Sequence, residues 1–172
     1  MKKMILSAMF IAMGIILPFL TGQIPTIGQM LLPMHIPVFL CGMICGSQYG
    51  LIIGAILPLL RFVLWGVPVF YPTAIAVAFE LATYGFVSGI LYNRMKHKNV
   101  YAVYGAMIPA MIIGRIIRGC MELILLGIKG DTYTVQIFFA SVILVAVPGI
   151  VLQLVLIPIL MSVLRRIVRI EQ

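Results

Sequence analysis

The sequence predicts an all-α, polytopic integral membrane protein with six transmembrane helices and both termini cytoplasmic. Three observations lead there: the apolar content, the spacing of the apolar runs and a one-sided distribution of charge. Of the 172 residues, 63% are hydrophobic and only 9% are charged, whereas soluble domains carry about a quarter charged and about half apolar residues. A soluble fold of this size cannot hide so much apolar surface. The composition therefore excludes a soluble enzyme, a disordered regulator and a disulfide-stapled secreted domain.

The first predicted helix covers residues of about 4–21. A membrane span needs roughly 20 mostly apolar residues, and this run has that length. It follows Met1 and two lysines, as a signal peptide would, but it is long and has no small-x-small cleavage site before Thr21. We therefore expect it to be retained as a helix. The next segment, 22–29, is uncharged and contains glycines, a proline and two glutamines, which predicts a loop.

The second and third helices come from one apolar stretch, about 33–64, that is too long for a single span. Residues 46–50, Gly-Ser-Gln-Tyr-Gly, lie in its middle and favour a break. This predicts a short helix of about 33–46 and a second helix of about 48–65. The Gly-Val-Pro triplet at 66–68 ends the second of these helices.

The second half of the chain predicts three further helices. They are separated by a basic turn at 93–99 and by a glycine-containing turn at 127–131. The last helix is expected to bend at Pro148, which is followed by glycine. Because the six helices use nearly the whole chain, we expect a single membrane domain over 1–172. These three helices cover about 71–92, 100–126 and 134–165.

The charge is strongly one-sided, with 12 Lys and Arg against 4 Asp and Glu and a net charge of +8. Six spans place both termini and the turn at 93–99 on one side of the membrane. The opposite side receives only Lys129 and Asp131. Such a bias marks the cytoplasmic side, and it is compatible with contact to anionic lipid. Without a module to present the charge, we expect no nucleic-acid partner. The basic residues on the cytoplasmic side are Lys2, Lys3, Arg94, Lys96, Lys98, Arg165, Arg166 and Arg169.

Five ionisable residues remain inside the predicted spans. Each is expensive near the bilayer centre and marks a functional or paired interior position. Three of them are spaced i, i+3, i+7 in the fifth helix and so share one face. One interpretation is a polar pocket open to the outside, where the surplus charge of +1 suits a ligand with an anionic or a strongly hydrogen-bond-accepting group. The other is purely structural, with Glu80 neutralising Arg61 or Arg115, and Arg118 pairing with Glu122. The five are Arg61, Glu80, Arg115, Arg118 and Glu122.

Four polar or aromatic residues near the outer side are further candidates for ligand contact. Gln29 belongs to the first outer loop, which is either a lid over the pocket or a plain connector. His35 begins the second helix and either donates to a ligand or is structural. Trp65 and Tyr71 form an aromatic belt or stack on a ring-shaped ligand.

The sequence lacks the residue patterns of metal sites and of catalysis. Cys41, Cys45 and Cys120 have no further ligands at coordinating spacing, so we expect buried apolar thiols and neither metal nor cofactor. No His-Glu-x-x-His, Gly-x-Ser-x-Gly or Walker A motif occurs. We therefore expect no enzymatic activity and no catalytic residues.

A small-x-x-x-small step at Ala8 and Ala12 allows another helix to approach the first helix closely. Six helices in under 200 residues, a lid-like first outer loop and this alanine step resemble the substrate-binding S components of energy-coupling factor (ECF) transporters. The likeness spans the whole chain. The stretch 31–42, Leu-Leu-Pro-Met-His-Ile-Pro-Val-Phe-Leu-Cys-Gly, resembles the start of the second helix in the riboflavin and pantothenate type.

The resemblance implies a subunit of the bacterial plasma membrane that binds a water-soluble vitamin or related micronutrient. Ala8 and Ala12 would contact a membrane coupling protein, the T component, and two cytoplasmic ATPases would drive uptake. The second helix lacks the acidic residue associated with riboflavin binders, which disfavours riboflavin and leaves open pantothenate, a pyridoxine-like ring, a queuine-type base or another micronutrient. The alternative is a stand-alone, proton-coupled secondary carrier or channel for a small polar solute.

Overall fold

The computed structural model describes residues 2–20, 33–129 and 147–167, and these are helical apart from short turns. The described residues contain no strand, which confirms the all-α prediction. The prediction of a single domain over 1–172 stays a prediction. The elements are α1 (Lys2–Leu20), α3 (His35–Cys45), α4 (Ser47–Trp65), the π-helical η1 (Phe70–Ala74), α5 (Ile75–Arg94), α6 (Val100–Lys129) and α8 (Val147–Ile167).

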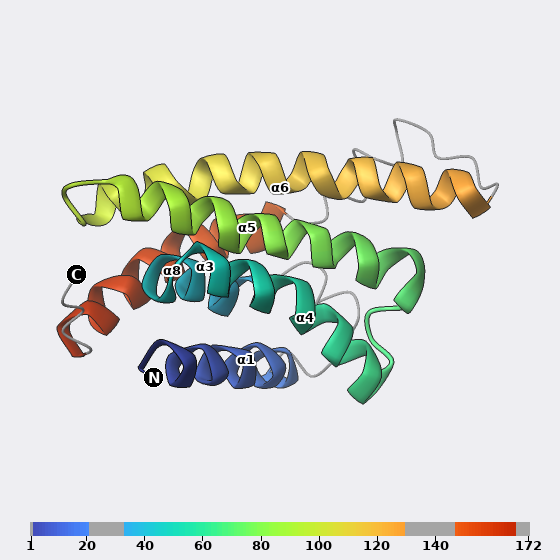
Figure 1. Ribbon diagram of the computed structural model, residues 1–172, viewed down its shortest axis with the longest axis horizontal. Coiled ribbons are helices and arrows are strands. Elements are labelled where there is room, and N and C mark those ends of the chain that lie inside the picture. The colour runs from blue at the N-terminus through green and yellow to red at the C-terminus, as the bar shows by residue number, and fades with distance from the viewer. Residues whose placement is uncertain (1, 21–32, 130–146, 168–172) are drawn as a thin grey trace.

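The helices lie side by side around α5, which packs against α3, α4 and α6 (Figure 1). Helix α1 covers α3 and α4, and α8 packs on α6 and α3. The start of α1, the turn between α5 and α6, and the end of α8 all lie toward the left end of the bundle in Figure 1. The basic residues of these segments are thus gathered at one end, as an even number of spans requires.

The outside of the bundle is apolar, as a bilayer demands of a membrane protein. Among the described residues, three segments are long and apolar enough to cross a membrane: Ser47–Trp65, Phe70–Arg94 and Val147–Leu164. The side chains of Ile52 and Ile112, for example, are 51% and 57% exposed on the surface of the bundle. Water would penalise such exposure of large aliphatic side chains, whereas lipid tails do not.

Helix boundaries follow local backbone chemistry. Gly46, with φ 114°, separates α3 from α4, a backbone conformation that a residue with a Cβ adopts only with strain. A left-handed Gly66 (φ 68°) ends α4, and its N–H donates to the carbonyl of Phe62. The expected bend at Pro148 involves residues before α8, and the segment 134–146 of the predicted last helix lies outside the described residues.

Helices α3, α4 and α5 approach each other at the level of the backbone. A Cβ added to Gly85 would lie 2.3 Å from the carbonyl oxygen of Gly50, and one added to Gly42 would lie 2.3 Å from that of Gly85. A Cβ on Gly54 would similarly meet the carbonyl of Leu81. These glycines therefore allow close helix packing, as small residues do between membrane helices.

Candidate functional site

The centre of the site is Glu80, a carboxylate of α5 with 0% exposure. Arg115 approaches one carboxylate oxygen with its Nη1 at 3.2 Å from Oε1, and Arg118 donates its Nη1–H to Oε2 at 3.1 Å. The hydroxyl of Tyr84, one turn along α5, donates to Oε1 at 2.7 Å. Both oxygens of Glu80 are therefore occupied by charged or neutral donors, which is what a buried carboxylate needs.

Helix α6 supplies the arginines from one face, as the i, i+3, i+7 spacing predicts. Arg118 also donates its Nε–H to Glu122 at 2.9 Å, so its guanidinium bridges two carboxylates. The neighbouring Gly114 explains how α6 comes so near: a Cβ there would lie 2.2 Å from the Tyr84 ring. The charged face of α6 points at α5 and not at lipid.

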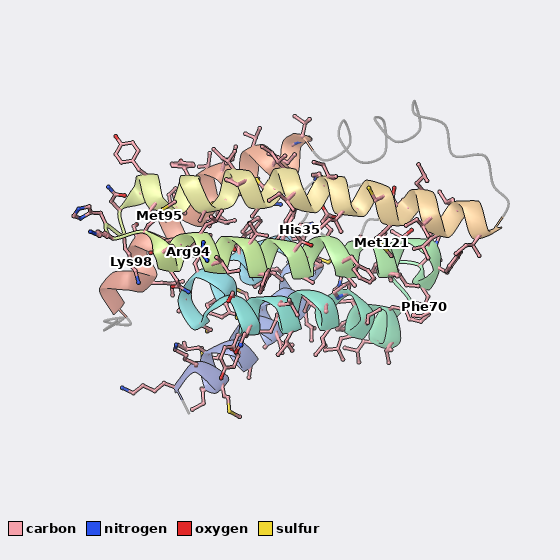
Figure 2. All side chains as sticks on the ribbon, turned by 45° about the horizontal axis from the view of Figure 1, so that its top comes forward. His35, Phe70, Arg94, Met95, Lys98 and Met121 are labelled. Carbon is pink, nitrogen blue, oxygen red and sulfur yellow. The ribbon has the colours of Figure 1, made fainter. Side chains whose placement is uncertain are left out.

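His35 lies against this cluster from α3 and is 1% exposed. Its Nε2 is 3.8 Å from Glu80 Oε2, which is too long for a hydrogen bond. Within the described part of the chain, neither ring nitrogen of His35 has a hydrogen-bond partner. The ring centroids of His35 and Tyr84 are 5.5 Å apart, and Phe39 stacks on Tyr84 at 4.9 Å. Figure 2 shows His35 in the middle of the bundle, with Arg94 and Lys98 at one end and Phe70 at the other.

The cluster is balanced in charge, because two arginines face two glutamates. Of the pairings considered for Glu80, the structure shows the one with Arg115, adds Arg118, and shows none with Arg61. The pair of Arg118 and Glu122 is also formed. Buried ion pairs of this kind are costly to break, because removing one partner leaves the other charge uncompensated. The structure thus contains ion pairs of the kind that the structural interpretation expects.

Arg61 is separate from the cluster. It is only 7% exposed, and none of the ion pairs among the described residues includes it. The reason is its depth. Three close contacts fix the antiparallel register of α4 and α5, and extrapolation of this register places Arg61 level with about residue 74. Glu80 is six residues farther along α5, or about 9 Å at 1.5 Å per residue. The contacts are Ser47 with Gly89, Gly50 with Gly85, and Gly54 with Leu81.

The two aromatic candidates for ligand contact, Trp65 and Tyr71, lie at the end of the bundle opposite the basic turn. Tyr71 donates its hydroxyl hydrogen to the carbonyl of Leu125 and so ties η1 to α6. Trp65, the last residue of α4, is 36% exposed. The rings of Phe62 and Phe70 are 5.1 Å apart and connect the end of α4 to η1. Gln29 lies outside the described residues.

Tyr84 of the site, and a buried glutamine of α8, were not singled out in the sequence. Tyr84 is spaced i+4 from Glu80, and this spacing on one helical face was the available signal. Gln153 of α8 is 1% exposed, and its side-chain nitrogen has no partner within the residues described. No pattern in an apolar helix identifies a lone glutamine as interior.

The three cysteines differ in their burial. Cys41 and Cys45 are buried as expected, and the Oγ of Ser7 is 3.8 Å from the Sγ of Cys41. Cys120 is exposed on the surface of α6, so the expectation that it is buried is wrong. It falls between the charged positions Arg118 and Glu122, on a different face of the helix. Over the described ranges, no three His, Cys, Asp or Glu side chains are grouped to hold a metal ion.

The outer face of α1 carries the alanine step. Ala8 and Ala12 are both exposed, whereas Ser7, Phe10 and Gly14 face the bundle. Next to the step lies a hollow of about 370 Å³ with apolar walls. Its lining residues are Met9, Ala12, Met13, Ile16 and Leu17.

An all-helical bundle with an apolar exterior and a buried ionic cluster defines a polytopic membrane protein with a polar interior site. The family model of the substrate-specific component of ECF transporters matches residues 2–161. The chain belongs to this family, whose members are subunits of transporters rather than enzymes. Comparison with curated proteins and with solved structures gave no match.

Proposed function

We infer that this protein is the subunit that captures a water-soluble micronutrient at the outer side of the bacterial plasma membrane and delivers it to an ATP-driven module. Membership of the family identifies the class of transporter to which this subunit belongs. The observation that carries the rest is the position of the charged interior groups, which lie from the middle of the bundle toward the end away from the basic turn. In the positive-inside orientation this end faces outward.

The proposed ligand site extends from the ionic cluster toward the Trp65 end of α4. His35 offers two ring nitrogens and Arg61 a guanidinium, and the cluster around Glu80 fixes the positions of α5 and α6. Trp65 and Tyr71 would border the entrance. Gln29 would join from the first outer loop. A few convergent polar groups within an otherwise apolar enclosure are typical of small-molecule sites.

The proposed docking face for the coupling protein is the exposed side of α1. Small side chains at Ala8 and Ala12 permit a partner helix to approach the backbone, which favours association within a membrane. The hollow beside Ala12 gives a partner side chain a place to insert. The partners are a T component in the membrane and two cytoplasmic ATPases.

Purification in detergent tests ligand capture. The protein is expected to retain a small polar compound, identified by mass spectrometry of the denatured sample, and to be stabilised against heat by that compound when it is added back. Absence of any bound compound, together with no stabilisation by a screen of water-soluble vitamins, would contradict ligand capture.

Co-purification tests the docking face. Ala8→Trp and Ala12→Trp are each expected to abolish co-purification with the T component while leaving ligand binding unchanged, because the bulky ring blocks helix approach. Ile159→Trp is the matched control, since Ile159 is also exposed on the bundle surface but belongs to α8. Association that survives both alanine changes would place the partner elsewhere. Ligand flux into liposomes without any ATPase would instead indicate a secondary carrier.

A further inference from the structure

Arg61 is a buried cation without a counter-ion in the described part of the chain. Its Nε is buried and has no hydrogen-bond partner there. An uncompensated charge in a membrane interior is strongly unfavourable. The helix that carries the arginine has its own packing contacts: Leu57, one turn earlier, lies against Gly14 of α1.

The other acidic residues of the chain leave one internal candidate for pairing with Arg61. The sequence has only four acids. Glu80 and Glu122 are engaged by Arg115 and Arg118, and Glu171 follows in the sequence after α8, whose end lies at the basic end of the bundle. Only Asp131 follows the outer end of α6. It lies outside the described residues, so its role is decided by experiment below.

We propose that Arg61 binds an ionised acidic group of the transported compound, a carboxylate or a phosphate, so that the substrate of this protein is an anion. This rests on the proposed function as a substrate-capturing subunit. The guanidinium presents parallel N–H donors that match the two oxygens of such a group. Since the cluster around Glu80 is neutral in itself, Arg61 carries the surplus positive charge of the membrane interior.

The depth of Arg61 gives it the first contact with an entering compound. It lies about 9 Å nearer the Trp65 end than Glu80, by the register of α4 and α5. A compound arriving from that end therefore reaches Arg61 before the ionic cluster. Its acidic group would stop at Arg61, and its uncharged part would extend toward His35, whose ring nitrogens accept or donate a hydrogen bond.

The proposal predicts opposite effects of one substitution with and without ligand. In ligand-free protein, Arg61→Gln removes an uncompensated buried charge, so the melting temperature is expected to rise or stay unchanged. The same change is expected to weaken binding of the anionic compound by about 100-fold or more, as loss of one partner of a buried ion pair does. Arg61→Lys keeps the charge but not the paired donors and is expected to retain binding within about tenfold of wild type.

The experiment compares wild type with Arg61→Gln, Arg61→Lys and the matched control Arg94→Gln, an exposed arginine of the basic end. Compounds released from each purified protein are identified by mass spectrometry, and the identified compound is titrated back calorimetrically. Pantothenate and its uncharged alcohol panthenol, and nicotinate and nicotinamide, are added as paired probes in thermal unfolding. We expect wild type and Arg94→Gln to release a compound whose acidic group is ionised at pH 7. Arg61→Gln is expected to release none of this compound.

Three results would overturn the inference. One is a bound compound without an ionised group, which refutes the anionic substrate but leaves the proposed function intact. The second is unchanged affinity in Arg61→Gln. The third is a lower melting temperature of ligand-free Arg61→Gln that Asp131→Asn reproduces, because Asp131 would then be the counter-ion. If wild type holds no compound and no probe stabilises it, the proposed function itself fails and the inference falls with it.

Discussion

Replacing Glu80 by glutamine tests whether the buried cluster holds α5 and α6 together. Glu80→Gln keeps the shape of the side chain but removes the charge that faces Arg115 at 3.2 Å and Arg118 at 3.1 Å. One of the two guanidinium groups, that of Arg118, retains Glu122 at 2.9 Å. Arg115 loses the carboxylate at 3.2 Å and is only 9% exposed.

The magnitude follows from the burial of the pair. Breaking a buried ion pair by removing one partner destabilises a protein by about 3–5 kcal/mol. For a chain of this length, each kcal/mol lowers the melting temperature by about 2–4 °C. We therefore expect Glu80→Gln to unfold about 6–20 °C below wild type. The double variant Glu80→Gln/Arg115→Gln restores the charge balance and is expected to recover a large part of this loss.

The assay is the temperature at which half of the detergent-purified protein disappears from its size-exclusion peak. Tyr84→Phe is a graded control, since it removes only the hydroxyl that donates to Glu80 at 2.7 Å and is expected to lower stability by about 1.5–3 kcal/mol. The reasoning is refuted if Glu80→Gln melts within 2 °C of wild type, or if the double variant is less stable than Glu80→Gln alone.

Two further substitutions address the packing of the bundle. Gly85→Ala places a Cβ 2.3 Å from the carbonyl oxygen of Gly50. We expect this variant to lose about 1–3 kcal/mol of folding stability or to fail to fold. The control Gly127→Ala meets no neighbour within 4 Å, so its stability should be unchanged or higher. Equal behaviour of the two variants in the size-exclusion assay would contradict close backbone packing. Tyr71→Phe removes the donor to the Leu125 carbonyl and should lower stability by about 1 kcal/mol, and an unchanged melting temperature would show that η1 is held to α6 by other contacts.

The sequence indicates which charged residues face the interior of the bundle. It indicates less readily which of these residues pair with each other. Arg115, Arg118 and Glu122 share a face because the period of the helix is fixed, and the structure turns this face toward α5. The partner of Glu80 depends on the register between helices, which no single helix encodes. By charge alone, Arg61 of α4 is a candidate partner of Glu80 on the neighbouring helix. The glycine contacts of α4 and α5, however, place Arg61 about 9 Å from the level of Glu80 along the bundle.

The helix ends were predictable where glycine dictates the backbone. Gly46 and Gly66 adopt positive φ and end α3 and α4 close to the expected positions. Only its i+4 spacing from Glu80 marks Tyr84 as a candidate member of the site, because nothing else in the sequence separates it from the other tyrosines of the chain. Cys120 shows the converse limit: an apolar neighbourhood in sequence does not tell whether a thiol faces the bundle or the lipid.

The glycine contacts of α3, α4 and α5 also bear on leakage. They continue from the level of Glu80 toward the basic end, since Gly85 and Gly89 of α5 touch Gly50 and Ser47 of α4. Backbones in van der Waals contact leave no room for a chain of water molecules between them. This part of the bundle therefore separates the charged groups from the basic end. The proposed outward-facing site would thus be separated from the cytoplasm along these three helices, which would limit the leakage of protons through them.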